Sequence, residues 1–211
     1  LEAGQDILYV GMSSGISGTY QASTLAAGEL RGEFPDRQIR TVDSLGAGFG
    51  PGLLTLRAAA AREAGKDAGA VADELEQARL NLCEYFTVDD LMFLRRSGRL
   101  NAASAVVGTM LGIKPILRGD EAGHIVVSHK CRGRKKALET LAQIYAQRVV
   151  HPQDQIVAIS HGDCPADARA LADRITEIAQ PKELLICPHE PFTGSHVGPG
   201  MLGLFFFSEG R

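Results

Sequence analysis

The feature that most constrains the fold is a repeated order of strand, loop and helix near the start of the chain. Ile7–Val10 is a short apolar run typical of a buried strand, and small and apolar residues predict a helix from about Thr19. The same order returns with a strand at Ile39–Val42 and a helix from about Pro51 to Ala64. Strands that alternate with helices form parallel sheets covered by helices. We therefore expect a parallel α/β domain over residues 1–80.

The end of this first region carries one more predicted helix, over residues 66–82. Asp67 is suited to cap its start, and Val71, Leu75 and Leu82 recur at the spacing of one helix face. We expect Leu82 to lie within this helix.

The order of elements changes in the second part of the chain, residues 81–211. We expect a short helix that ends in a glycine turn at 88–100, a helix of small residues at 101–111, a strand at 113–117 and a hairpin at 118–130. Helices at 134–149 and 166–179 then alternate with strands at 156–161 and 183–189, and the apolar run 202–207 follows. This order favours an α+β domain with a mixed or antiparallel sheet.

Charge and composition exclude some classes of protein. The 22 basic residues are outnumbered by 25 acidic ones, so the net charge of −3 provides no overall field that would attract nucleic acid. No stretch has the length and hydrophobicity of a transmembrane helix, and the start of the chain lacks a signal peptide pattern. We expect a cytoplasmic protein without a nucleic-acid partner. Because the chain begins at Leu1, almost directly in a strand, we also expect an upstream segment to be missing.

The four cysteines form no CxxC pair, which favours reduced packing residues. His129 with Cys131, and Cys187 with His189, each stand at i and i+2 on one strand face. They could bind a metal if their two strands met. We favour packing and expect no metal.

The loop after the first strand, "GMSSGISGT", is a candidate anion site. Ser13 and Ser14 supply hydroxyl donors, glycines allow close approach to the backbone, and the free N–H groups of the following helix carry partial positive charge. The alternative is that the hydroxyls only cap the helix.

The same loop raises an enzyme alternative. Gly11–Gly15 fits the G-x-S-x-G pattern of a serine hydrolase, and Asp163 and His196 follow in the order Ser, Asp, His. However, the loop continues to Gly18, whereas a nucleophile elbow needs its helix to begin directly after the serine. The match is therefore weak.

Two basic clusters and the C-terminal motif complete the candidates. Arg96 and Arg99 lie around a tight turn, and Arg132 belongs to the basic run of residues 130–136. Guanidinium groups suit carboxylate, phosphate or an acidic protein surface, and the alternative is a solvated face. His196 stands in a Gly-Pro loop before the apolar run 202–207, which predicts either a buried final strand or the wall of an apolar cavity.

Five ordered blocks resemble one family, the DegV family of fatty-acid-binding proteins. They are "SSGISGTYQAS", "VDSLGAGFG", "LMFLRRSGRLNAASAVVGTMLGIKPIL", "HKCRGRKKAL" and "SHVGPGMLGLFF". The resemblance implies a two-domain fold, a long-chain fatty acid bound between the domains, and no catalytic activity or other cofactor. It also implies a role as the acyl-carrying partner of a fatty acid kinase, with apolar segments such as 106–111 and 201–207 lining the cavity.

Carried over by position, the resemblance assigns the fatty acid carboxylate to Ser13 and Ser14, with His196 close by. Arg96 and Arg99 are candidates for the supporting network, and Arg132 for the contact with the kinase. Two departures matter. Ser97 occupies a position that is often glycine in the family, and the family's N-terminal strand and Thr-Ser-rich loop have no counterpart here.

Overall fold

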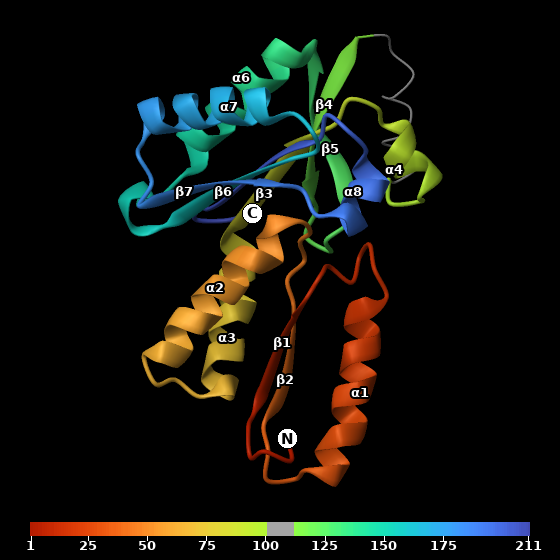
Figure 1. The fold of residues 1–211 in the computed structure, drawn as a ribbon, viewed down its shortest axis with the longest axis vertical. Helices are drawn as coiled ribbons and strands as arrows, with labels where there is room; N and C mark the ends of the chain where they lie inside the picture. The colour runs from red at the N-terminus through yellow and green to blue at the C-terminus, as the bar shows by residue number, and fades with distance from the viewer. Residues whose placement is uncertain (101–111) are drawn as a thin grey trace.

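The computed structural model describes residues 1–100 and 112–211, which build two β-sheets (Figure 1). Strand β1 (Ile7–Gly11) pairs in parallel with β2 (Ile39–Asp43). The second sheet has six strands in the order β5-β4-β3-β8-β6-β7. These strands are β3 (Leu82–Thr87), β4 (Ile113–Gly119), β5 (Ile125–Arg132), β6 (Ile156–His161), β7 (Glu183–Pro188) and β8 (Leu202–Phe207). Only the β6–β7 pair is parallel among the described pairs of this sheet, so the sheet is mixed.

Helices cover both sides of the small sheet. Helix α1 (Thr19–Glu33) lies on one side, and α2 (Phe49–Glu63) and α3 (Ala68–Ala78) lie on the other (Figure 1). The Asp67 side chain accepts hydrogen bonds from the first amides of α3, as the sequence predicts. The parallel α/β arrangement of this region is confirmed.

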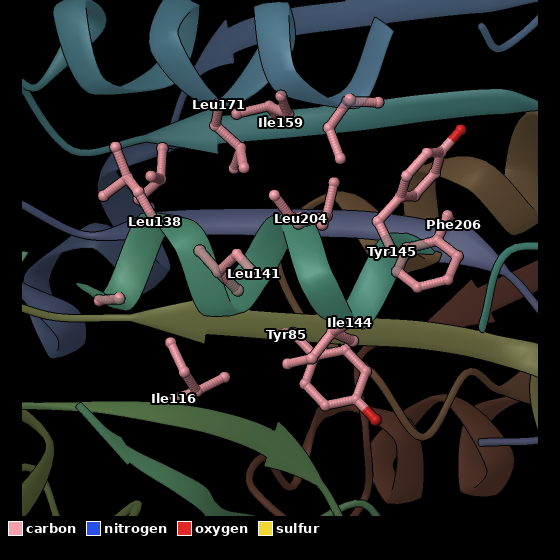
Figure 2. Close-up of a cluster of buried hydrophobic side chains, with 14 of the residues drawn as sticks. Tyr85, Ile116, Leu138, Leu141, Ile144, Tyr145, Ile159, Leu171, Leu204 and Phe206 are labelled. Atoms are coloured by element: carbon pink, nitrogen blue, oxygen red, sulfur yellow. The ribbon is translucent and has the colours of Figure 1, made fainter. Parts of the chain in front are cut away.

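Helices α6 (Arg134–Arg148) and α7 (Pro165–Ile178) pack together on one face of the six-stranded sheet. Leu141 of α6 and Leu171 of α7 are fully buried there against Ile159 and Leu204 of the central strands (Figure 2). Tyr145 stacks edge-on against Phe206, with ring centroids 5.3 Å apart. This core fixes the face of the sheet that turns away from the small sheet.

Three elements differ from the sequence analysis or add to it. The prediction that Leu82 lies in a helix is wrong: α3 ends at Ala78, a 3₁₀ turn covers Arg79–Asn81, and Leu82 begins strand β3. The short helices α4 (Met92–Arg96) and α8 (Pro191–Val197) flank the six-stranded sheet, and α8 was not predicted. A 3₁₀ turn at Pro152–Asp154 precedes β6.

Two sequence predictions stay open. The predicted helix over 101–111, with its cavity-lining segment 106–111, lies outside the described residues. The division into domains 1–80 and 81–211 stays a prediction.

Candidate functional site: a pocket between the two sheets

Three connections meet where the small sheet approaches the six-stranded sheet. They are the serine loop (residues 12–18, between β1 and α1), the glycine loop (residues 44–48, between β2 and α2) and the hairpin turn (residues 120–124, between β4 and β5). The Ser13 N–H donates to the Gly46 carbonyl at 2.8 Å, and the Ser13 hydroxyl donates to the Gly123 carbonyl at 2.9 Å. All three connections are therefore joined at Ser13.

A pocket opens beside this junction, with about 780 Å³ of free space including the part open to solvent. Its floor is the face of the six-stranded sheet opposite α6 and α7, and its wall includes α8 and the end of α4. The apolar lining residues are Met12, Ile16, Leu45, Ala47, Phe86, Leu94, Ile125, Phe192, Val197, Met201 and Phe205. An apolar cavity with few polar groups is the usual form of a site for an apolar ligand.

Ser13 is fully buried, and its hydroxyl is used inside the protein. Besides donating to Gly123, the Ser13 oxygen accepts the Gly15 N–H at 3.1 Å. A side chain at Gly15 or Gly123 would collide with this junction, because a Cβ at Gly123 would lie 2.0 Å from the Ser13 hydroxyl. Ser13 therefore holds the serine loop against the hairpin turn.

Ser14 faces the other way. The residue is exposed, and its N–H donates to the Asp43 carboxylate at 3.2 Å. In the described part of the chain no hydrogen bond engages the Ser14 hydroxyl. Neither Ser13 nor Ser14 lines the pocket itself, whereas Ser17 of the same loop does.

The rim of the pocket carries an aromatic and basic group of side chains. Phe192 of α8 is 64% exposed, and its ring meets His196 edge-on at 6.0 Å. Both residues line the pocket, as does the exposed Arg99 beyond the end of α4. The rim thus combines an apolar ring with two groups that can donate hydrogen bonds to an anion.

Two buried titratable side chains lie deeper in the pocket. Glu84 of β3 accepts the Ala47 N–H at 3.0 Å, and burial raises its pKa to about 7 against the opposing effects of Arg211 and that N–H. His189, after β7, lies between the hydroxyls of Ser160 and Thr193, at 3.1 and 2.6 Å. Burial lowers the pKa of His189, although the Glu190 carboxylate opposes this effect.

The comparisons with known proteins identify the family. The model of a family described as "Uncharacterised protein, DegV family" matches residues 1–209. A DegV domain-containing protein of Clostridium perfringens is 40% identical over 209 residues, which cover 99% of this chain and 72% of that protein. The chain belongs to the DegV family.

Solved DegV structures have the same fold. A DegV protein of Thermus thermophilus, described by its fatty acid binding, has a TM-score of 0.85 and 30% identity over 98% of this chain and 72% of its own. A DegV protein of Ruminococcus gnavus, solved with vaccenic acid, has a TM-score of 0.88 and 29% identity, covering 95% of this chain and 72% of its own.

The structure brings some of the residues predicted from the DegV resemblance together and separates others. His196 and Arg99 share the pocket rim, and the serine loop borders it. Arg96 is exposed at the end of α4 and does not line the pocket. Arg132 is exposed at the end of β5 opposite the hairpin turn, and at about 3.3 Å per residue it lies about 23 Å along the strand from Ile125 in the pocket wall.

Arg134, in the same basic run as Arg132, has a structural role in this DegV chain. Its guanidinium donates to Asp167 at 2.8 Å and to the Gly200 carbonyl at 2.7 Å. It thereby ties α6 to α7 and to the Gly-Pro loop before β8. Arg132 and Arg134 differ in role although they are two residues apart.

The structure also bears on two alternative interpretations of this DegV chain. Strands β5 and β7 form opposite edges of the six-stranded sheet, so the pairs His129–Cys131 and Cys187–His189 cannot share a metal. Among the described residues no cluster of three metal-binding side chains occurs. For the hydrolase alternative, the Ser13 hydroxyl is buried and donates to a backbone carbonyl rather than to a histidine base.

The polar residues inside the pocket were missed in the sequence. Glu84 stood in no recognised motif, Thr193 began the C-terminal motif without being singled out, and His189 was considered only as a metal ligand. The signal that could have found Glu84 is a single carboxylate within the apolar run "LCEYFT". Over residues 1–100 and 112–211, no helix has both the length and the apolar character needed to cross a membrane.

Proposed function

We propose that this chain binds a long-chain fatty acid in the pocket, with the carboxylate at the serine loop and the rim, and that it is a binding protein rather than an enzyme. The observation that carries the proposal is an apolar pocket bordered by hydroxyl, imidazole and guanidinium groups. Two DegV relatives are described with fatty acids, which supports the same ligand class. Each buried methylene contributes about 0.8 kcal/mol, so the acyl chain supplies most of the affinity.

The headgroup contacts follow from the roles of the two adjacent serines. Ser13 shapes the loop through its bonds to Gly123 and Gly15, while Ser14 offers an exposed hydroxyl. His196 of α8 and Arg99 beyond the end of α4 line the rim of the pocket that the serine loop borders at Ser17. Hydrogen bonds to a charged group are worth about 1.5–3 kcal/mol each, so they orient the acid and add to the affinity from the tail. Arg96, exposed at the end of α4 and outside the pocket lining, is proposed only as an outer part of this group.

The resemblance to the DegV family further suggests that the bound fatty acid is presented to a fatty acid kinase. Arg132 is the proposed contact, since it is exposed and no salt bridge engages it among the described residues. Because Arg132 lies far along β5 from the pocket wall, a kinase that reaches both would cover a broad surface.

The direct test is to denature the purified protein and identify the released lipid by mass spectrometry. We expect about one fatty acid per chain. An empty protein that also fails to bind an added fluorescent fatty acid would overturn the proposal.

The headgroup is tested by Ser14→Ala and His196→Ala, with Ser195→Ala as the matched control. Ser195 is an exposed serine on α8 that does not line the pocket. We expect weaker fatty acid binding in the first two variants and unchanged binding in the control. Wild-type affinity in both Ser14→Ala and His196→Ala would remove the proposed headgroup site.

A further inference from the structure

Glu84 is a buried carboxyl group in a pocket proposed to bind a carboxylate and its apolar tail. Only 8% of the residue is exposed, and it is the one carboxylate side chain among the described residues that line the pocket. The five sequence blocks that carry the family resemblance do not include it. Its role therefore needs a separate explanation, which rests on the proposed function.

The surroundings hold the Glu84 carboxyl tightly. Oε2 accepts the Ala47 N–H, while Oε1 is enclosed without a hydrogen-bond partner in the described structure. Oε1 lies against the backbone of Gly46 and Gly50, where a Cβ would come within 1.9 and 1.5 Å of it. Gly46 and Gly50 thus make room for this carboxyl beside the glycine loop, whose Gly46 carbonyl accepts the Ser13 N–H.

Few charged groups face Glu84. Arg211, at the end of the described chain, is the cation that favours its charged form, and its guanidinium donates to the Leu45 carbonyl of the glycine loop. The other titratable groups that line the pocket are His189, His196 and Arg99, while Asp43, Glu190 and the hairpin-turn residues Asp120, Glu121 and His124 lie on the connections around it. His189 is held between two hydroxyls, and Asp43 accepts backbone N–H groups of the serine and glycine loops. Oε1 itself receives no donor from any of them.

Both the acyl tail and the carboxylate of a bound fatty acid favour the neutral form of the Glu84 carboxyl. An acyl tail displaces water from the pocket and makes a charged carboxylate there less favourable. A fatty acid carboxylate at the serine loop adds a second negative charge, which also disfavours ionised Glu84. Both effects favour the neutral carboxyl, whichever part of the ligand lies closer.

We propose that Glu84 couples ligand binding to proton binding, so that the pocket takes up a fatty acid anion and a proton together. The neutral Glu84 carboxyl is the form that accepts the ligand. Ionised Glu84 favours the water-filled pocket and release of the fatty acid.

The pH range of this coupling follows from the free protein. With the pKa of Glu84 at about 7, the carboxyl is neutral well below pH 7 and charged well above it. If only the neutral form binds, linkage predicts that the dissociation constant rises about fivefold between pH 7 and 8 and hardly changes between pH 5 and 6.

The test compares the pH dependence of hexadecanoate binding in the wild type, Glu84→Gln and Glu121→Gln. Glutamine keeps the size of the side chain and an oxygen that can accept the Ala47 N–H, but it does not titrate in this range. Glu121 undergoes the same chemical change at the exposed tip of the hairpin turn. We expect the fivefold change in the wild type and in Glu121→Gln, and less than a twofold change in Glu84→Gln.

A second measurement on the wild type keeps the proposal testable if Glu84→Gln does not fold. Calorimetric titration at pH 7.5 in two buffers with different ionisation heats gives the number of protons taken up, which we expect to be about 0.8 per ligand. Equal pH profiles in wild type and Glu84→Gln, or proton uptake near zero, would overturn the coupling while leaving fatty acid binding intact. Absence of binding at every pH would instead reject the proposed function.

Discussion

Replacing Ser13 with alanine is expected to destabilise the fold, because this side chain holds three segments together. The hydroxyl donates to the Gly123 carbonyl at 2.9 Å and accepts the Gly15 N–H at 3.1 Å, and the residue has no exposed surface. Alanine removes both bonds and leaves the buried Gly123 carbonyl and the half-buried Gly15 N–H without this partner.

The magnitude follows from the two lost bonds. A typical intramolecular hydrogen bond contributes about 1 kcal/mol net, and a buried polar group left unpaired costs about 1–3 kcal/mol. We therefore expect a loss of about 2–4 kcal/mol in the free energy of unfolding. For a chain of this size, a loss of 2 kcal/mol lowers Tm by roughly 4–8 °C.

The measurement is urea denaturation of wild type, Ser13→Ala and Ser14→Ala, followed by fatty acid binding to each folded variant. Ser14→Ala serves as the matched control, since its exposed hydroxyl predicts a change in stability within about 0.5 kcal/mol. A stability loss in Ser13→Ala similar to that in Ser14→Ala would refute the structural role of Ser13.

A double-mutant cycle with Gly123→Ala tests the contact itself. The added Cβ would lie 2.0 Å from the Ser13 hydroxyl, at a glycine with φ of +77°. Removing the Ser13 hydroxyl relieves this collision but not the backbone strain at Gly123. The stability loss of the double variant should therefore be smaller than the sum of the two single losses by more than about 0.5 kcal/mol. Simple additivity would contradict the proposed contact.

Three further predictions concern charge. Burial raises the pKa of Glu84 from 4.5 to about 7. Between pH 4.5 and pH 7, Glu84 is therefore protonated in the folded protein but ionised in the unfolded chain. The free energy of unfolding of the wild type relative to Glu84→Gln should fall by about 2 kcal/mol between pH 5 and pH 7.5, measured by urea denaturation at the two pH values, and a constant difference would contradict it. Arg132→Glu should keep bound fatty acid and stability but reduce acyl phosphate formation with a cognate kinase and ATP, whereas a wild-type rate would reject the docking role. Arg134→Gln should lower Tm instead, because it breaks the bonds to Asp167 and Gly200.

Local patterns predicted most of the regular structure. The parallel pair β1–β2, the hairpin β4–β5 and the cap at Asp67 depend on neighbouring residues, and each is confirmed. The start of strand β3 was misassigned because Leu82 continues the helical spacing of Val71 and Leu75, so the predicted helix was carried over the first residue of the strand. Helix α8 was missed because its seven residues include a proline and a glycine and are too few for a periodic signal.

The deeper part of the candidate site could not be read from the sequence because it depends on contacts between distant segments. Glu84 can be buried in a strand only because Gly46 of the glycine loop and Gly50 in the first turn of α2 leave space for it, and both are far from Glu84 in sequence. Two residues singled out in the sequence, His196 and Arg99, do line the rim of the pocket, while their contact with a ligand stays a prediction. His196 and Arg99 stand in motifs whose glycines already indicate loops, and loops carry binding residues more often than cores do.

The serine loop shows why a motif alone does not assign roles to its residues. A run of serines and glycines before a helix predicts hydroxyl and amide donors, but it does not say whether they face a ligand or another part of the chain. Ser13 and Ser14 are adjacent, and one is fully buried while the other is exposed. The difference arises because Gly123 and Gly46, both distant in sequence, offer carbonyls to Ser13 alone. The loop therefore joins the two sheets at Ser13, while the Ser14 hydroxyl is the one we propose for the ligand, so substitutions at the two positions should separate stability from binding.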